Sequence, residues 1–178
     1  TDRITNKDRW LARVSHTFRL SSNNSFGLSA IRVSDNNYFA DFGASVLAAS
    51  QRILPATVQI NGNFQGWQYL TMFQKYQVLQ DPGAPILPPY EWSPRIRFSN
   101  NRILKINKLD IDASGIFEMT HFTHPSMAEG TRIVGDANFS SPLLIGGVRL
   151  MPQFGMHLTS YSHSKNGRKI TNNKSLST

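Results

Sequence analysis

The strongest constraint in this chain is a series of strand-like segments joined by connections that alternate between short and long. We expect strands at about 8–20, 26–34, 54–63, 67–79, 92–99, 108–121, 131–141 and 147–160. The short connections are near 21–25, 64–66, 100–107 and 142–146, and the longer ones are 35–53, 80–91 and 122–130. A sheet that passes up and down through a membrane has tight turns on one side and long loops on the other. The sequence therefore predicts an all-β fold with about eight antiparallel strands in up-and-down order.

Apolar and polar residues alternate within most of these segments. Between positions 92 and 99, for example, Trp92, Ile96 and Phe98 share one parity, and Arg95 and Arg97 share the other. Successive side chains of a strand point to opposite faces of the sheet, so this period of two predicts one apolar and one polar face. A soluble sandwich alternates in the same way, and the pattern alone does not place the sheet in lipid.

Composition narrows the fold class further. The apolar fraction of 39% is below the roughly 45–50% of packed globular proteins, and a barrel with a polar interior tolerates this. No apolar run approaches the ~20 residues of a membrane helix, so any spanning element must be a strand. The absence of cysteine excludes disulfides and thiol chemistry in this stretch. The chain starts at Thr1 without a signal peptide, and we expect a mature protein or a piece of a longer one.

The net charge of +8 raises the question of a nucleic-acid partner. The arginines are spread along the predicted strands rather than gathered in one stripe, and we therefore expect no nucleic-acid binding. The stretch 164–178 is rich in Ser, Asn and Lys, a composition typical of disorder. We accordingly divide the chain into a sheet over 1–163 and a disordered tail over 164–178.

Residues that suggest catalysis have simpler explanations. His121 and His124 are three positions apart, which places them on opposite faces of a strand, and no third metal ligand is evident. Asp110 and Asp112 share a face, where carboxylates are normally solvated or paired with cations. Phosphate-binding glycine loops and nucleophile elbows are absent from the sequence. We predict no catalytic residues, no metal or cofactor, and no enzymatic activity.

The connections contain motifs that resemble, in order, those of one family. Residues 33–43 read VSDNNYFADFG and resemble the VSDxxYFxDFG segment of the LPS-assembly protein LptD family. Similar stretches follow at 54–57, 75–81 and 89–90, and FTHP at 122–125 with EGTR at 129–132 resembles the family's FxHP…EGxR loop. The resemblance covers about residues 2–163, and the tail departs from it. The candidate motif residues of these loops are Tyr38, Phe39, Asp41, Phe42, Pro125, Gly130 and Arg132.

This resemblance implies a large transmembrane β-barrel of the Gram-negative outer membrane. Proteins of that family receive lipopolysaccharide from a periplasmic Lpt bridge and insert it into the outer leaflet, with an LptE-like lipoprotein as a plug in the lumen. The chain resembles only an internal stretch of the barrel wall. We therefore expect it to act as part of the translocon, in contact with lipopolysaccharide, the plug, the bridge and outer-membrane lipid, and not to be competent alone.

The resemblance also gives the arginines of the polar parity a candidate role, because arginine binds phosphate through a planar fork. The candidate lumen-facing contacts to lipopolysaccharide are Arg9, Arg13, Arg19, Arg95, Arg97 and Arg149. The alternative, which we favour, is that they pair with acidic residues of the same face or contact the plug. Those acidic residues are Asp110, Asp112, Glu118 and Asp136.

Two other classes of protein remain open from the sequence. One is a small outer-membrane barrel of eight strands that closes on itself. The other is a soluble jelly-roll or capsid-like shell protein whose basic ends bind nucleic acid. Solubility without detergent would favour the shell protein, and heat-modifiable gel mobility without partners would favour the small barrel.

Overall fold

A computed structural model describes residues 8–43, 45, 50–107, 109–165 and 168–177, and the chain in it is almost entirely β. The elements are β1 (Leu11–Arg19), β2 (Asn24–Val33), α1 (Tyr38–Phe42), β3 (Ile53–Phe64), β4 (Trp67–Val78), β5 (Glu91–Ile106), β6 (Leu109–Thr123), β7 (Glu129–Ser140), β8 (Leu143–Ile145), β9 (Val148–Leu150), β10 (Gln153–Lys165) and β11 (Arg168–Ser177). Among the described residues, no helix has the length and apolar character needed to cross a membrane.

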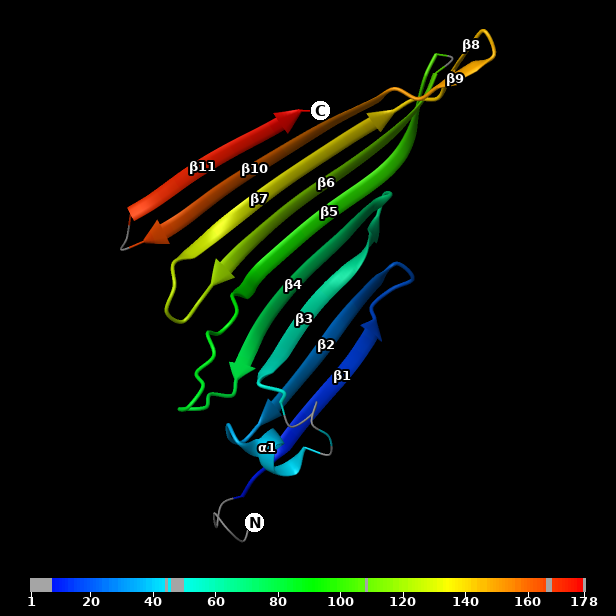
Figure 1. The fold of residues 1–178 in the computed structure, drawn as a ribbon. Coiled ribbons are helices and arrows are strands. Elements are labelled where there is room, and N and C mark those ends of the chain that lie inside the picture. The colour runs from blue at the N-terminus through cyan, green and yellow to red at the C-terminus, as the bar shows by residue number, and fades with distance from the viewer. Residues whose placement is uncertain (1–7, 44, 46–49, 108, 166–167, 178) are drawn as a thin grey trace.

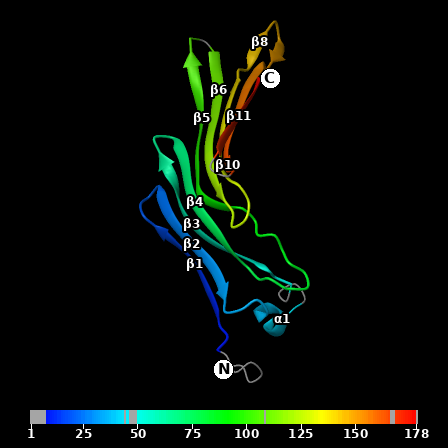
Figure 2. The same ribbon diagram turned by 90° about the vertical axis from the view of Figure 1, so that its left-hand side faces the viewer.

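The main sheet has nine strands in the order β1-β2-β3-β4-β5-β6-β7-β10-β11, and every neighbouring pair is antiparallel. Strands β8 and β9 form a separate two-stranded hairpin between β7 and β10. The sheet is a single curved layer (Figures 1 and 2). Consecutive strands lie side by side, which confirms the all-β, up-and-down prediction and is not the Greek-key order of a jelly roll.

Several predicted boundaries were wrong. The segment 147–160 was expected to be one strand, but β9 belongs to the small hairpin and β10 begins at Gln153. The turn predicted over 100–107 is mostly strand, because β5 continues to Ile106 and the chain reverses after Asn107, which has a φ of 56°. Asparagine is one of the few residues other than glycine that adopts this conformation readily.

The predicted disordered tail was also wrong over 168–177, which forms β11 and pairs with β10 from Lys165↔Arg168 to Met156↔Ser177. The main sheet therefore has nine strands, where we predicted about eight. A polar composition limits the core that a segment can build. It does not prevent the segment's backbone from pairing with the open edge of a sheet.

Cross-strand registers place most of the apolar parity on one face. Trp92 is an exception, because the register shifts between Trp92 and Arg95 and pairs Trp92 with Phe122 on the face of Glu118. Paired residues lie on the same face, so one row can be followed across eight strands. The row is Phe18, Phe26, Ile60, Thr71, Ile96, Met119, Ile133 and Ser160. Among the described residues, no second layer covers this face, and Phe18 and Ile133 remain 47% and 40% exposed.

The connections of the sheet gather at two ends. The described residues of segment 34–52 lie at one end together with segments 79–90 and 124–128, and this end, here called the loop end, also carries α1 (Figure 1). The turns after β1, β3 and β5 lie at the opposite end, here called the turn end, together with the β8–β9 hairpin. The predicted alternation of short and long connections fails toward the C-terminus, because 124–128 is short and 141–152 is not.

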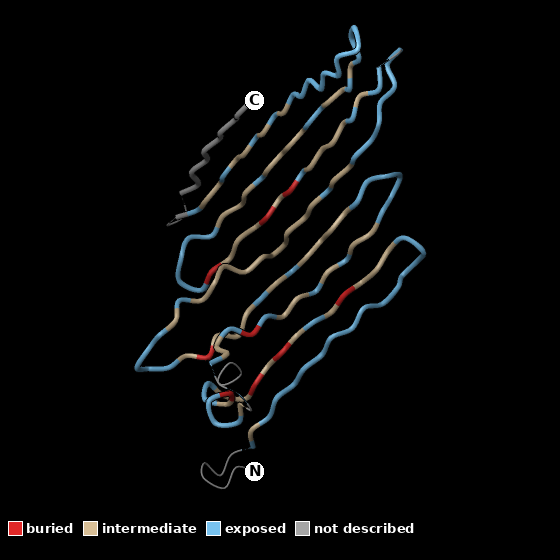
Figure 3. The backbone as a smooth tube through the Cα atoms, turned by 45° about the vertical axis from the view of Figure 1, so that its right-hand side comes forward, coloured by how far each residue is buried: buried red, intermediate tan, exposed pale blue. Residues whose placement is uncertain are grey.

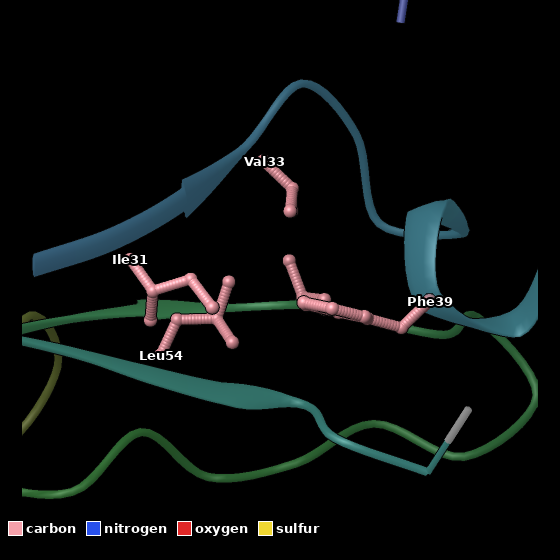
Figure 4. Packing of buried hydrophobic residues seen from close by; sticks show 5 residues of the cluster. Ile31, Val33, Phe39 and Leu54 are labelled. Atoms are coloured by element: carbon pink, nitrogen blue, oxygen red, sulfur yellow. The ribbon is translucent and has the colours of Figure 1, made fainter. Parts of the chain in front are cut away.

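A small apolar core lies at the loop end. Helix α1 directs Phe39 against Ile31, Val33 and Leu54 (Figure 4), and Leu79 completes the cluster. Figure 3 shows how sparse the buried positions are over the rest of the sheet. The fold is held by strand pairing over most of its area, and by side-chain packing mainly where α1 covers the strand ends.

Candidate functional site

A cluster of charged and aromatic side chains surrounds Arg9 at the loop end. Arg9 donates to both carboxylate oxygens of Asp35, from Nε at 2.9 Å and from Nη2 at 2.8 Å, and its Nη1 donates to Asp41 at 2.7 Å. The guanidinium lies 4.7 Å from the Phe42 ring centroid and 5.8 Å from that of Tyr38. Arginine thus uses its planar fork and its flat face at the same time, which a lysine cannot do.

The same cluster fixes the loop that begins with Asp35. Asp35 accepts hydrogen bonds from the hydroxyl of Ser34 at 2.7 Å and from the backbone N–H of Asn37 at 3.0 Å. Hydrogen bonds from Arg9 hold the pKa of Asp35 below its usual range, and the bonds to Asp35 and then Asp41 raise the pKa of Arg9. Four motif residues (Tyr38, Phe39, Asp41 and Phe42) therefore dock α1 on the sheet.

A second cluster joins two loops through His124, which is 7% exposed. Its Nδ1 accepts the backbone N–H groups of Ser126 and Met127 at 3.0 and 2.9 Å, and its Nε2 donates to the carbonyl of Pro88 at 2.8 Å. The ring of Tyr90 lies 5.0 Å from that of His124. His124 therefore connects segments 79–90 and 124–128.

His121, the second histidine of the pair considered as metal ligands, forms a hydrogen bond of 3.0 Å between its Nδ1 and the hydroxyl of Thr131. Across the part of the chain that the structure describes, no group of three metal-ligating side chains occurs.

Two further motif residues lie at the start of β7. A Cβ atom on Gly130 would lie 2.9 Å from the carbonyl oxygen of Ser162 in β10, so a larger residue would push these strands apart. Arg132 extends over the polar face and donates to Glu118 at 2.9 Å. Pro125 is exposed beside His124 and makes no hydrogen bond that the structure records. The motif thus marks where loops attach to strands.

The polar face carries a charged cluster of three strands centred on Glu118. Arg95 in β5 donates to Oε2 at 2.7 Å, and Arg132 in β7 donates to Oε1. Their guanidinium groups also lie 5.0 and 5.5 Å from the rings of Trp92 and Phe122. The Glu118 side chain is only 11% exposed. One buried carboxylate therefore pairs with two arginines, and the cluster keeps a net positive charge.

A second polar contact lies beside it on β7 and β10. The Nδ1–H of His157 donates to Asp136, and the hydroxyl of Thr159 lies 2.7 Å from Nε2 of the same ring. Sequence reasoning missed His157 as a partner of Asp136, because their pairing depends on a register between strands that are separated by the β8–β9 hairpin.

The six candidate arginines have different surroundings. Arg13, Arg19 and Arg97 lie on the polar face, and no carboxylate of the described residues is within ion-pair distance of them. Arg9 precedes β1 and is bound in the loop-end cluster, so its predicted position on a polar strand face was wrong. Arg149 was also misplaced, since β9 is outside the main sheet.

The expected acidic partners are similarly divided. Glu118 pairs with Arg95 as we expected, whereas Asp136 binds His157 and Asp110 lies 4.0 Å from Lys105. Asp112 lines a hollow on the polar face. Arg132, singled out only as a motif residue, is the second cation of the Glu118 cluster.

One apolar face, one polar face and nine consecutively paired antiparallel strands define a section of the wall of a transmembrane β-barrel. Residues 7–178 match the family LptD, LPS transport system D, and the chain belongs to this family. The match continues to residue 178, so the expectation that the tail departs from the family pattern was wrong.

Similar proteins carry the same name. The LPS-assembly protein LptD of Nitrosomonas eutropha is 31% identical over 179 aligned residues, which cover 97% of this chain and 24% of that protein. LPS-assembly protein LptD of Thiobacillus denitrificans is 30% identical over 88% of the chain and 21% of its own length. The LPS-assembly protein LptD of Nitrosomonas europaea is 30% identical, and the alignment covers 99% of this chain and 25% of that protein. The chain thus spans about a quarter of the length of the curated relatives it matches.

Proposed function

We propose that this chain forms part of the wall of a lipopolysaccharide-assembly barrel in the Gram-negative outer membrane. The complete barrel would insert lipopolysaccharide into the outer leaflet, by transport rather than by catalysis. The relatives named LPS-assembly protein support this, and so does the division of the sheet into an apolar and a polar face. The apolar face would contact lipid, and the polar face would line the lumen.

The observation that carries the proposal is the mainly apolar row across the sheet, in which six of the eight residues are apolar and the other two are Thr71 and Ser160. Lipid cannot hydrogen-bond to a backbone, so a spanning sheet needs every strand paired and an apolar exterior. Both conditions hold for the interior strands of the described sheet. Of the alternatives, a closed small barrel would need β1 to pair with β11, and these strands are at opposite edges.

We further propose lipopolysaccharide, an LptE-like plug and the periplasmic Lpt bridge as partners of the whole protein. Family membership supports these partners. The structure narrows which arginines are available to a phosphate. Arg9 and Arg95 are bound to carboxylates, and Arg149 is on the β8–β9 hairpin. The remaining candidates for headgroup contact are Arg13, Arg19 and Arg97.

The decisive comparison is between Arg95→Gln and Arg97→Gln in the full-length protein. Arg95→Gln should lower barrel stability, because it leaves Glu118 with one cation instead of two. Arg97→Gln should preserve stability and reduce delivery of lipopolysaccharide to the cell surface, because Arg97 has no carboxylate partner among the described residues. Surface lipopolysaccharide and the temperature at which the barrel unfolds in detergent are measured separately.

The matched variant Glu118→Gln removes both ion pairs and should destabilise the barrel by up to about 3–5 kcal/mol, the range for breaking a buried pair. Normal delivery in Arg13→Gln, Arg19→Gln and Arg97→Gln together would contradict a role for the polar face in headgroup contact.

A further inference from the structure

An arginine lies on the apolar face of the main sheet, toward the turn end. Arg102 in β5 pairs with Ala113 in β6, and four positions earlier in β5 Phe98 pairs with Phe117. Residues four positions apart in a strand point to the same face. Arg102 therefore shares the face that the proposed function turns toward lipid. A charge on that face needs a partner, because an isolated charge in an apolar medium costs a large free energy.

The position of Arg102 along its strand is that of a membrane boundary. On the same face of β6, His121 and Thr123 lie eight and ten positions from Ala113. A strand tilted by about 45° crosses the hydrocarbon layer in about 9–11 residues. The polar residues at the two ends of this stretch therefore match the two boundaries of the layer. Arg102, beside Ala113, lies at the level of the lipid headgroups.

The turn between β3 and β4 holds the side chain of Arg102 in place. Its Nη2 donates to the carbonyl of Gln65, and the side chain of Asn100 donates to the carbonyl of Gly66 at 2.7 Å. Gln65 and Gly66 have φ values of 50° and 82°, as in the tight turns that join antiparallel strands. A Cβ atom on Gly66 would lie 3.4 Å from Nη2 of Arg102. The guanidinium thus lies against the turn before any ligand arrives.

Most of this guanidinium is left for a partner outside the described chain. Within the described ranges, the Gln65 carbonyl is the hydrogen-bond acceptor recorded for Arg102, and no carboxylate is within ion-pair distance of it. The nearby acidic residues, Asp110 and Asp112, are one position out of phase with Ala113 and lie on the polar face. A guanidinium has five N–H donors, so several remain for an anion.

The anion available at this level of a membrane is the phosphate of a lipid headgroup. A phosphate accepts two parallel hydrogen bonds from one guanidinium. Trp67 pairs with Asn100 on the same face and is 43% exposed, and tryptophan is typical of the boundary between lipid and water. The acyl chains of the same lipid would extend over Phe98 and Phe117. One lipid molecule therefore matches both the charge and the apolar surface.

We propose that Arg102 binds the phosphate of a membrane lipid on the outside of the barrel. The inference rests on the proposed contact between the apolar face and lipid, and it adds a defined headgroup site to that face. The hairpin of β5 and β6 continues past the β3–β4 turn (Figures 1 and 2), so the site lies on the side of a projecting hairpin. A lipid bound there anchors this hairpin to the surface of the leaflet.

Native mass spectrometry of the full-length protein tests the site. Phosphatidylglycerol is titrated into the protein in a neutral detergent, and bound lipid is counted for Arg102→Gln and for Lys105→Gln. The two variants remove the same charge from the same strand, but Lys105 lies on the polar face. Arg102→Gln should weaken lipid binding about fivefold, the effect of one basic residue at an anionic lipid surface. Lys105→Gln should leave it unchanged.

Two further variants separate the charge from the shape of the turn. Asn100→Ala removes the other side-chain hydrogen bond to the turn without removing a charge, and it should weaken binding less than Arg102→Gln. Arg102→Lys should retain more affinity than Arg102→Gln. Equal weakening by Arg102→Gln and Lys105→Gln would overturn the site, because net charge alone would account for it. Equal weakening by Asn100→Ala would overturn the role of the guanidinium.

Inorganic phosphate tests whether the site takes a lipid or any phosphate. An excess of inorganic phosphate should not displace phosphatidylglycerol, because the acyl chains also bind the apolar face. Full displacement would overturn the assignment to a lipid.

Cross-linking in cells separates this site from the proposed function. A benzophenone amino acid is placed at Ala113, beside Arg102, or at Phe117 within the apolar face. Lipid adducts at Ala113 should fall about fivefold in Arg102→Gln, those at Phe117 should not change, and the adduct mass distinguishes a glycerophospholipid from lipopolysaccharide. Unchanged adducts at Ala113 would overturn the headgroup site alone. Absence of lipid adducts at both positions would overturn the lipid-facing side of the proposed function as well.

Discussion

Arg9 holds the loop end together through contacts that depend on the shape of its side chain. It binds Asp35 through a two-pronged contact and Asp41 through a third nitrogen, with its flat face near Phe42. Lysine would keep the charge and lose the fork. In Arg9→Lys, we therefore expect faster amide hydrogen exchange over residues 33–43 of the full-length protein, measured by mass spectrometry.

The matched control is Arg13→Lys on the polar face of β1. No described carboxylate pairs with Arg13, so exchange over 33–43 should remain as in the unchanged protein. Equal protection in the Arg9→Lys and unchanged proteins would mean that α1 is held by Phe39 packing alone.

Asp35 should make the loop end sensitive to acid only at low pH. Arg9 lowers the pKa of Asp35 in the folded protein. As the pH falls, an Asp35 that is released from the loop therefore takes up a proton before the folded one does, at about pH 3.9. The carboxylate therefore contributes its full stabilisation above that pH and loses it as the pH falls through the lower, folded value. Exchange over 33–43, corrected for intrinsic rates, should stay slow to about pH 4 and rise below it.

Asp35→Asn provides the comparison for this titration. The variant should show weakened protection at neutral pH and little further change in acid. Protection in the unchanged protein that disappears above about pH 5 would assign the transition to another group, since a lowered aspartate pKa cannot account for it.

At the scale of elements, the up-and-down order places all the loops of one end on the same side. Asn37, Ala84 and Ala128 lie in successive connections of the loop end and are exposed. Epitope tags inserted at these positions should be accessible together from one side of the membrane, and a tag at Ser22 should be accessible from the other. A single tag on the wrong side would require one strand more or fewer.

The two faces of β6 should respond oppositely to the same substitution. Phe117 lies on the apolar face and Ser114 on the polar face. Phe117→Arg should cost roughly 2–4 kcal/mol if the site lies near the bilayer midplane, whereas Ser114→Arg should cost much less. Unfolding of the full-length protein into denaturant compares the two. A larger loss for Ser114→Arg would reverse the facing of the sheet.

The elements differ in how far they could be predicted. The facing of Phe18, Ile96, Phe117 and Phe154 follows from the period of two and is confirmed by the registers. Strand β11 was missed because backbone pairing leaves little trace in a polar sequence. The partners of Arg9 lie 26 and 32 residues away in the connection between β2 and β3, and no local pattern indicates them.

At the scale of the whole molecule, the described sheet has two open edges. Strands β1 and β11 each have a paired neighbour on one side only. Unpaired edges are disfavoured in lipid and tend to pair with other chains. The isolated chain in detergent should therefore form mixed oligomers, as measured by size-exclusion chromatography with light scattering. A uniform monomer with heat-modifiable mobility would instead indicate a sheet able to close on itself.

The consecutive pairing of nine strands also limits which changes in gene length such a protein can accept. Deleting one residue within β6 would exchange the facing of Phe117 and Glu118, and the neighbouring strands would have to shift with it. Adding residues to segment 79–90 would leave every register unchanged. Inherited insertions and deletions should therefore be confined to the connections, while the strands diverge only by substitution.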